Sequence, residues 1–382
     1  MKYDIIIIGG GMVGATLAIA LQKSGKSIAL VEAKPLSKED HRLIALSDTS
    51  VSLFKNLNMW SSLLPAASII QEVHVSHRGR FGVTRISANI LKLPALGYVV
   101  PANDINQVLY ATLKDVDIIL PATLKNLHQS SDTVTLHLDI SGEIKEYQAE
   151  HVIGADGTHS TVRQLSNIPM KEIDYGQSAI VTKTVLKRDH QNIAYERFLK
   201  EGAIAMLPLK GKEVATIWTD KNARISELMQ CHDEVFLENL QKEFGYRLGR
   251  LEQIKKRSVY PLLRLEAECH QKNRVFLIGN AVHTIHPIAA QGLNLALYEA
   301  AVLVDFLLET HASKDVFTPK QNFSKNLSHH LSWIFSSDFF LLNRMRGMAM
   351  IALDLSVTCK EYFVNRALYR HDLMPNLLRN HS

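Results

Sequence analysis

A strand that runs into a glycine-rich turn constrains the fold of this chain more than any other feature. A strand-like run at Tyr3–Ile8 leads into three glycines in GxGxxG spacing, Gly9, Gly11 and Gly14. A helix-like stretch at 13–24 follows, with Gly25 as its stop. A second strand at 27–31 then ends at an acid, Glu32. This order predicts a βαβ unit of the dinucleotide-binding kind. A purely structural glycine turn is the alternative, and the strand, helix and acid in this order favour nucleotide binding.

Each part of this motif has a chemical reason. The glycines permit a tight turn, close backbone approach to a pyrophosphate, and close packing of helix on strand. The helix N-terminus offers free N–H groups and a positive dipole end to the phosphates. Glu32 stands where a carboxylate can accept hydrogen bonds from ribose hydroxyls.

Length and composition bound the remaining options. With 382 residues, the chain is too long for one small core and is expected to form two intertwined domains. Its 46% hydrophobic and 21% charged residues are ordinary for a globular protein. The net charge is +5, and residues 320–382, with eight Lys/Arg and four Asp/Glu, carry most of it. No basic run with interleaved aromatics occurs, so no nucleic-acid partner is expected, and the basic tail suits an anionic surface.

Cysteine usage and hydropathy indicate a cytoplasmic chain that does not span a membrane. Cys231, Cys269 and Cys359 are widely spaced, which suggests reduced thiols and neither a disulfide framework nor a metal site. The glycines after Ile8 interrupt the N-terminal apolar run and argue against a signal peptide. No other window has the roughly 18 uncharged apolar residues of a membrane span.

Two further motifs follow strand-like segments. The first is Gly154–Arg163, which reads GADGTHSTVR and, taken alone, could be a capped turn into a helix. The second is Gly279–Asn294, which joins the strand at 274–278 to a long helix, expected at 291–309. Gly292 at the start of that helix would expose backbone N–H groups to a phosphate or an electron-rich ring edge. Between the αβ segments lie β-rich insertions, which predict a discontinuous cofactor domain.

In their order and separation, the three motifs resemble those of the class A flavoprotein aromatic hydroxylases, the para-hydroxybenzoate hydroxylase superfamily. Several segments are also similar to the ubiquinone-biosynthesis hydroxylases of the 2-octaprenyl-6-methoxyphenol type within it: Arg42–Ser47, Phe244–Gly249, Lys256–Leu262 and His286–Ala289. The resemblance spans nearly the whole chain. It implies FAD as cofactor and NAD(P)H as co-substrate. It further implies that O2 adds at the flavin C4a and that the hydroperoxide hydroxylates a polyprenyl phenol.

The resemblance also implies an architecture. We expect an α/β fold with an FAD-binding Rossmann-like domain of the glutathione-reductase type, an inserted β-rich substrate domain and a C-terminal helical segment. The expected ranges are 1–70, 101–170 and 263–320 for the FAD-binding domain, 71–100 and 171–262 for the substrate domain, and 321–382 for the helical region. The single GxGxxG fits a family that binds NAD(P)H only transiently, without a second Rossmann domain.

The family's site residues carry over to positions that match its motifs. The first motif would hold the ADP half of FAD, the second would lie near FAD and NAD(P)H, and the third would hold the ribityl chain and flavin ring. The expected cofactor-binding residues are Gly9, Gly11, Gly14, Glu32, Arg42, Gln107, Asp156, Gly157, Gly279, Asn280, Pro287, Gln291, Gly292, Leu293 and Asn294. Asn280, where most of the superfamily has Asp, can still accept from a ribityl hydroxyl, but without charge. Ala290 and Ala296 stand where glycine is common.

Catalytic assignments are fewer. Arg42 is the best polar candidate beside the flavin, with a surface residue before a helix cap at Ser47 or Asp48 as its alternative reading. Pro287 stiffens the approach to the ring. His283 and His286 form an HxxH pair without nearby carboxylate or thiol ligands, so no metal site is expected.

The C-terminal residues bear on how the substrate is reached. Five apolar side chains with helical spacing fall on one face beside Arg344 and Arg346: Leu331, Phe335, Phe339, Leu342 and Met345. Two readings stay open: a helix packed on the FAD domain, and a face that docks on the inner-membrane surface or on a quinone-biosynthesis complex. A homo-oligomer is a further expected form of association.

Two alternative functions belong to other classes. One is an FAD-dependent reductase or dehydrogenase of the same superfold, and oxygen incorporation into product would distinguish the hydroxylase from it. The other is a non-catalytic prenyl-lipid-binding accessory subunit with a vestigial flavin site, against which bound flavin would argue.

Overall fold

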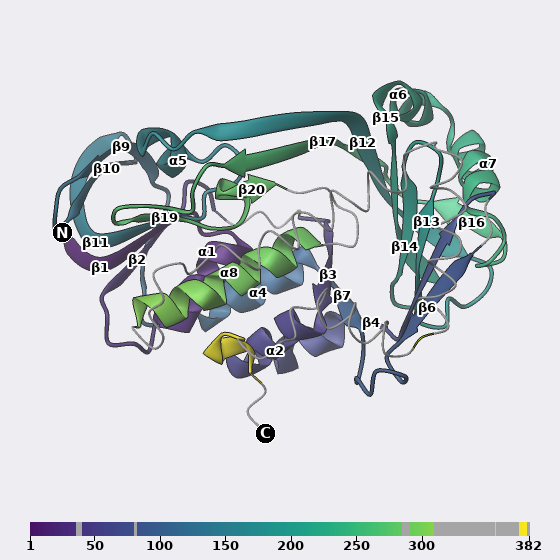
Figure 1. Cartoon of the computed structure of the whole chain (residues 1–382), viewed down its shortest axis with the longest axis horizontal. Coiled ribbons are helices and arrows are strands. Elements are labelled where there is room, and N and C mark those ends of the chain that lie inside the picture. The colour runs from purple at the N-terminus through teal and green to yellow at the C-terminus, as the bar shows by residue number, and fades with distance from the viewer. Residues whose placement is uncertain (36–39, 80–81, 285–290, 309–355, 357–373, 380–382) are drawn as a thin grey trace.

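The computed structural model in Figure 1 describes residues 1–35, 40–79, 82–284, 291–308, 356 and 374–379. Three β-sheets and the helices packed on them make up this part of the chain. The expected α/β fold class is confirmed.

The first sheet, sheet A, contains the strand that precedes the glycine-rich turn. Its strands are β1 (Lys2–Ile8), β2 (Ile28–Val31), β8 (Asp117–Ile119), β9 (Thr123–Gln129), β10 (Val134–Ile140), β11 (Glu143–Gly154), β18 (Gln271–Lys272) and β19 (Val275–Leu277). Strands β19, β11, β1, β2 and β8 lie side by side and run parallel. Ile5 and Ile7 of β1 pack into one core cluster, and Ile6 and Ile8 pack into another on the opposite face. A parallel strand buried on both faces explains the continuous apolar run in the sequence.

Helices cover one face of sheet A, as Figure 1 shows. They are α1 (Met12–Leu21), α2 (Asp48–Asn56), α3 (Trp60–Leu63), α4 (Ala102–Thr112) and α8 (Gln291–Leu307). The helix expected at 13–24 begins one residue earlier and ends at Leu21, and Gly25 lies in the turn beyond it with φ +77°. Ser47 caps α2, because its side chain accepts a hydrogen bond from the Ser50 N–H at 3.2 Å. Of the two caps expected from the sequence, Ser47 is therefore the one that the fold uses.

The second sheet, sheet C, is the β-rich part at the right of Figure 1. Its strands are β5 (Glu72–His77), β6 (Val83–Ser87), β12 (Met170–Leu186), β13 (Ile193–Phe198), β14 (Ala203–Pro208), β15 (Glu213–Lys221), β16 (Leu251–Ile254), β17 (Ser258–Ala267) and β20 (His283–Thr284). The long antiparallel strands β12 and β17 connect this part to sheet A. Helices α6 (Asn222–Gln230) and α7 (Asp233–Phe244) cover one face, where Trp218 packs on Phe236 with ring centroids 5.6 Å apart.

The smallest sheet, sheet B, lies between these two parts. It consists of β3 (Leu43–Ser47), β4 (Ser68–Ile70) and β7 (Gly97–Pro101). Ile70 and Val99 of this sheet pack with Ala194 and Ala215 of sheet C in one apolar cluster. The expected insertion 71–100 is thus divided between sheets, since β5 and β6 join sheet C whereas β7 joins sheet B. The expected domain ranges remain predictions.

Strands β10 and β11 form a hairpin whose second strand is the longer one. Ser141 and Gly142 form the turn with φ of +56° and +93°. Strand β11 continues without a break from Glu143 to Gly154. It pairs with β10 along its first part and with β1 along its second, so no turn is needed between them.

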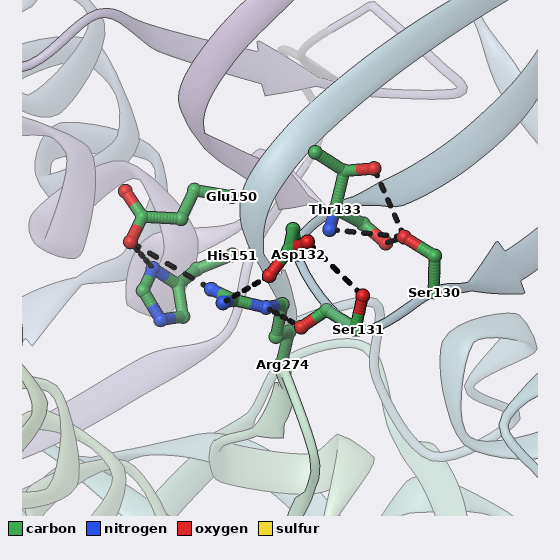
Figure 2. Close-up of polar contacts among 7 residues, drawn as sticks. All are labelled: Ser130, Ser131, Asp132, Thr133, Glu150, His151 and Arg274. Atoms are coloured by element: carbon green, nitrogen blue, oxygen red, sulfur yellow. Dashed lines mark hydrogen bonds and ion pairs between the residues drawn. The ribbon is translucent and has the colours of Figure 1, made fainter.

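Arg274, just before β19, ties three segments together at the edge of sheet A that lies opposite the glycine-rich turn. Figure 2 shows its guanidinium between the β9–β10 turn and β11. Nε donates to the carbonyl oxygen of Ser131 at 2.9 Å, and Nη1 lies 3.7 Å from Oε1 of Glu150. Within the turn, the N–H of Thr133 donates to Oγ of Ser130 at 3.1 Å. These contacts fix the start of β19 and leave its carboxyl end to the candidate site.

The described C-terminal residues lie against α2. A short 3₁₀ turn, η4 (Asn376–Leu378), is held by Nδ2 of Asn56, which donates to the carbonyl oxygen of Leu377 at 2.9 Å. The expected helical region 321–382 and its apolar stripe fall outside the described residues, apart from this turn and residue 356. Of the helices described in the structure, none has the length and apolar character that crossing a membrane requires.

Candidate cofactor and active site

The carboxyl ends of four parallel strands line up at one edge of sheet A. Ile8 pairs with Val31 on one side and Gly154 on the other, and Gly154 pairs in turn with Leu277. The Ala155 N–H donates to the carbonyl oxygen of Ile8 at 2.8 Å, which joins the first two loops directly. All three predicted motifs therefore begin at the same edge, where open α/β sheets bind their ligands.

Two glycines of the first motif are required by the fold itself. Gly9 has φ +106°, and a side chain there would collide with the backbone of Ala155. A side chain at Gly14 would collide with the carbonyl oxygen of Gly9. Because glycine has no side chain at these two positions, the start of α1 can lie close to the end of β1.

Gly11 is different, because nothing in the described protein requires a glycine there. Its φ is −66°, which any residue adopts, and no protein atom lies within 4 Å of where a Cβ would stand. Gly11 is exposed at the N-terminal end of α1, where backbone N–H groups are free to bind an anion. The open space beside Gly11 fits a pyrophosphate.

Glu32, at the end of β2, lies beside this turn. Its Oε2 accepts from the N–H of Gly10 at 2.7 Å, and its Oε1 accepts from the N–H of Lys34 at 3.0 Å. The other side of Gly10 is held by Tyr110 of α4, whose hydroxyl donates to the Gly10 carbonyl oxygen at 2.9 Å. Burial, together with the charge of Glu32, raises the pKa of Tyr110 to about 12. Glu32 and Tyr110 thus hold the N–H and the carbonyl oxygen of Gly10, and the expected role of Glu32 toward a ribose stays a prediction.

In the second motif, Asp156 is the residue left with an unused acceptor. Its Oδ2 accepts from the N–H of Val162 at 3.1 Å, whereas its Oδ1 is buried with no hydrogen-bond partner among the described residues. Burial raises the pKa of Asp156. Gly157 follows with φ +82° and no protein atom within 4 Å of its Cβ direction. A buried acceptor without a partner among the described residues fits a hydroxyl or amide donor from a bound cofactor.

Arg163 connects the second motif to the third. Its side chain is 4% exposed; Nη1 donates to the carbonyl oxygen of Ala281 at 2.7 Å, and Nη2 donates to that of Thr158 at 3.0 Å. Burial lowers the pKa of Arg163, and the nearby Asp156 offsets part of that effect. Arg163 therefore joins the loops of the second and third motifs directly.

The third motif begins with the 3₁₀ turn η2 (Gly279–Ala281). Gly279 has φ +60° and fits between α1 and α8, where an added Cβ would lie 3.4 Å from Cγ2 of Val13 and 3.3 Å from Cβ of Ala296. Asn280, the next residue, is exposed. Asn280 is therefore accessible from solvent, and its expected role in binding the ribityl chain stays a prediction.

The start of α8 is built around Asn294. The described backbone places Gln291, Gly292 and Leu293 in the first turn, and no atom of the described residues lies within 4 Å of the Cβ direction of Gly292. Asn294 itself is buried, and its side chain binds Ala45, Ser47 and Ser50 of the β3–α2 segment. Its side chain thus positions the β3–α2 segment, and the expected contact of this turn with the cofactor stays a prediction.

The remaining predicted residues are exposed or lie outside the described residues. Arg42, just before β3, has a side chain 59% exposed and is paired with Asp40 at 2.6 Å. That hydrogen bond raises the pKa of Arg42, and the charge of Asp40 and a smaller contribution from Tyr260 of β17 act in the same direction, against the effect of burial. Gln107 is exposed on α4, one turn before Tyr110, with no contact to the glycine turn. Pro287 lies outside the described residues.

Three residues of the site were not found by sequence reasoning: Tyr110, Arg163 as a link between loops, and Glu299 as the partner of His283. Tyr110 lies in an ordinary amphipathic helix, and nothing in its spacing marks it. The HxxH spacing marks His283 only as a candidate metal ligand, and its hydrogen-bond partner Glu299 lies on the next helix. Among the described residues, no group of three or more His, Cys, Asp or Glu side chains could hold a metal ion.

The fold and this glycine-lined edge define a dinucleotide-binding protein of the flavoprotein kind. A family model described as an FAD binding domain matches residues 2–314. The chain is similar to the 3-demethoxyubiquinol 3-hydroxylase of Escherichia coli (strain K12), with 31% identity over 387 residues, 96% of this chain and 98% of that protein. It is 30% identical over 313 residues to ubiquinone hydroxylase UbiL of Rhodospirillum rubrum, covering 80% of this chain and 72% of that protein.

Among solved structures, p-nitrophenol 4-monooxygenase PnpA from Pseudomonas putida DLL-E4 shares the fold. Its TM-score is 0.78 at 14% identity, and the match covers 97% of this chain and all of that chain. The chain belongs to the FAD-dependent hydroxylases of ubiquinone biosynthesis, within the class A flavoprotein aromatic hydroxylase family. It is therefore an oxidoreductase whose cofactor is FAD, and NAD(P)H as co-substrate is consistent with the family.

Proposed function

We propose that this chain hydroxylates the ring of a polyprenyl phenol similar to 2-octaprenyl-6-methoxyphenol, with NAD(P)H and O2 as co-substrates. The observation that carries the proposal is the meeting of three motif loops at the edge where β1, β11 and β19 end. The family relationship supplies the reaction class. When bound, FAD supplies the redox chemistry that activates O2, and the protein supplies position, electrostatics and exclusion of water.

The ADP half of FAD is proposed to lie along the first motif. Gly11 would leave room for the pyrophosphate at the N-terminus of α1, and Glu32 would accept from the ribose hydroxyls. The flavin half would extend toward the third motif. There the Asn280 amide would bind the ribityl chain, Asp156 Oδ1 would accept from a nearby donor, and the backbone at Gly292 and Leu293 would face the ring edge.

Arg42 is proposed as the polar group beside the reacting ring. Arg42 directly precedes β3 of sheet B, and its side chain is largely exposed. A fixed cation there would favour the phenolate form of the substrate, which enriches the ring for attack by an electrophilic oxygen. Pro287, by its place in the third motif, is proposed to shape the approach to the ring.

The test of function uses purified holoprotein and a short-chain prenyl phenol. Substrate-stimulated NAD(P)H oxidation, with oxygen from isotope-labelled O2 in the product, is the expected result. Substrate reduction without oxygen incorporation would establish the reductase alternative instead. Protein that binds flavin poorly and does not oxidise NAD(P)H would support the accessory-subunit alternative.

A second substrate has a specific observation in its favour. The Escherichia coli relative is named for hydroxylation of 3-demethoxyubiquinol at position 3, a different ring position. Quinone intermediates in a strain lacking the gene decide between the two substrates, because the missing step leaves its own phenol or quinol to accumulate. Accumulation of the 6-methoxyphenol supports our proposal, and accumulation of the demethoxy compound supports the alternative.

We also propose that the chain acts in the cytoplasm at the inner-membrane surface. A polyprenyl substrate dissolves in the bilayer, and the sequence 331–346 offers an apolar helical stripe with flanking arginines. A quinone-biosynthesis complex or a homo-oligomer would use the same stripe. The Phe335→Ser, Phe339→Ser double variant should then bind anionic liposomes less well and keep its FAD. A large loss of thermal stability with unchanged liposome binding would instead place this stripe in the protein core.

A further inference from the structure

A buried acid–imidazole pair lies behind the third motif. Glu299, in the middle of α8, has no solvent exposure, and His283 of β20 is 2% exposed. Oε1 of Glu299 lies 2.6 Å from Nε2 of His283, and Oε2 accepts from the N–H of Gly279 at 2.9 Å. One carboxylate therefore holds both ends of the turn 279–283.

The net shift of the Glu299 pKa is downward. Burial, the largest single influence, raises this pKa, and it is outweighed by the attraction of His283 and His270 together with the hydrogen bonds from His283 and from the Gly279 N–H. The lowered pKa favours the carboxylate form, which only accepts hydrogen bonds, so Nε2 of His283 is then the donor. Burying such a pair is a poor way to stabilise a core, because desolvation offsets much of the attraction. Its value lies in the fixed geometry that a short, charge-assisted hydrogen bond imposes.

That geometry bears on Asn280. The residues on both sides of it, Gly279 and His283, are bound to the same carboxylate, and Ala281 is bound by the buried Arg163. Glu299 and Arg163 are both buried, whereas Asn280, which lies between these contacts in the sequence, is exposed. The turn is thus held by buried side chains, and it carries one exposed residue, Asn280.

We propose that Glu299 is a positioning residue that, through His283 and Gly279, preorganises the turn carrying Asn280 to receive the flavin half of FAD. This inference rests on the cofactor placement proposed above. Preorganisation would appear as affinity, since a turn that is already fixed loses little freedom when FAD binds.

The first test measures FAD affinity of the apoprotein by quenching of flavin fluorescence, at a temperature where all variants are folded. Glu299→Gln keeps a carbonyl acceptor for Gly279 but loses the charge that holds His283. The expected result is a rise in the FAD dissociation constant of about tenfold, the usual size for losing an outer hydrogen-bond partner of a bound group. Affinity within twofold of wild type would overturn the proposal.

The second test uses two variants of the partner and remains decisive if Glu299→Gln does not fold. His283→Gln retains an N–H donor for the carboxylate and should bind FAD within about threefold of wild type. His283→Leu removes the donor and should bind at least as weakly as Glu299→Gln. Equal affinities for the two His283 variants would show that the hydrogen bond has no part in cofactor binding.

A readout without FAD identifies the pair itself. The Nε2 proton of His283 should give a strongly downfield NMR resonance in the apoprotein, and Glu299→Gln should remove it. Tyr298→Phe, a buried change at the next position of α8, serves as the matched control. It should leave both the resonance and the FAD affinity unchanged, whatever it does to the melting temperature. If Tyr298→Phe loses as much FAD affinity as Glu299→Gln, Glu299 affects cofactor binding only through the packing of α8.

Gly11→Val separates failure of this inference from failure of the cofactor site. If Gly11→Val abolishes FAD binding and Glu299→Gln does not weaken it, the positioning role is wrong and the cofactor placement stands. If Gly11→Val binds FAD normally, the placement is wrong, and the inference falls with it.

Discussion

The amide of Asn294, on α8, binds the backbone of Ser47, at the end of β3, across 247 residues of sequence. Oδ1 accepts from the Ser47 N–H at 2.9 Å and from Oγ of Ser50 at 2.7 Å, while Nδ2 donates to the carbonyl oxygen of Ala45 at 3.0 Å. The strand that follows Arg42 is therefore placed by the helix of the third motif. The proposed catalytic arginine and the proposed flavin-ring loop share one support.

Asn294→Ala should destabilise the protein by about 1–3 kcal/mol, because the part-buried backbone groups of Ala45 and Ser47 and the buried hydroxyl of Ser50 lose their partner. The measurement is urea unfolding of the apoprotein. Gln107→Ala, an exposed change on α4, is the control and should stay within about 0.5 kcal/mol of wild type. If the two variants are equally stable, the amide does not support β3.

Substitutions at Gly11 and Gly14, three residues apart, should have different effects on flavin binding and on folding. Gly11→Val should fold, because its backbone conformation and surroundings accept a side chain, yet purify without the yellow colour of flavin. Gly14→Ala should lose fold stability, because its Cβ would collide with the backbone of Gly9. Circular dichroism and flavin absorbance on the same samples separate the two effects. Normal flavin content in folded Gly11→Val would refute the pyrophosphate placement.

Tyr110→Phe removes the hydroxyl that holds the Gly10 carbonyl oxygen. We expect a stability loss of about 1 kcal/mol and a several-fold weaker FAD affinity, since the glycine turn loses one of its two supports. Tyr147→Phe, at another buried tyrosine on β11, is the control for loss of a phenol alone. Unchanged affinity in Tyr110→Phe, with Glu32 intact, would mean that the acid alone fixes the turn.

Stability should fall in mild acid because of His74 on β5. This side chain is 7% exposed. Burial lowers its pKa to about 4, assisted by repulsion from Arg247, Arg85 and Arg197. A base whose folded pKa is depressed contributes stability that is full above its unfolded pKa, about 6.5, and is lost as pH falls toward 4. The maximum effect is about 3 kcal/mol.

Thermal unfolding of wild type and His74→Gln between pH 7 and pH 4 checks this. Wild type should lose more stability than the variant across that window, since only wild type takes up the proton on unfolding. His128→Gln, at an exposed position, should follow wild type. Parallel curves for wild type and His74→Gln would show that His74 is not the titrating group.

Sequence reasoning identified the parts of the site that are local in the chain. The strand, the glycines after Ile8 and Glu32 could be placed because a βαβ unit is short and its spacing is set by backbone geometry. The supports of these loops could not be placed. Tyr110 reaches Gly10 across 100 residues, and Glu299 reaches Gly279 from the next helix, so both depend on how helices pack on sheet A. Tertiary packing of this kind leaves no periodic pattern in one sequence.

Sheet A has a consequence for the order in which the chain becomes stable during translation. Strand β1 leaves the ribosome early, but its neighbour β11 follows only after sheet B and the β5–β6 hairpin, and β19 only after most of sheet C. Until then, the apolar edge of β1 that will face β11 is unpaired, and such an edge invites association with other chains. Stable loading of FAD at the proposed site requires α8, which is synthesised after sheet A and most of sheet C. Nascent chains that stop before α8 should aggregate or be degraded without ever acquiring flavin.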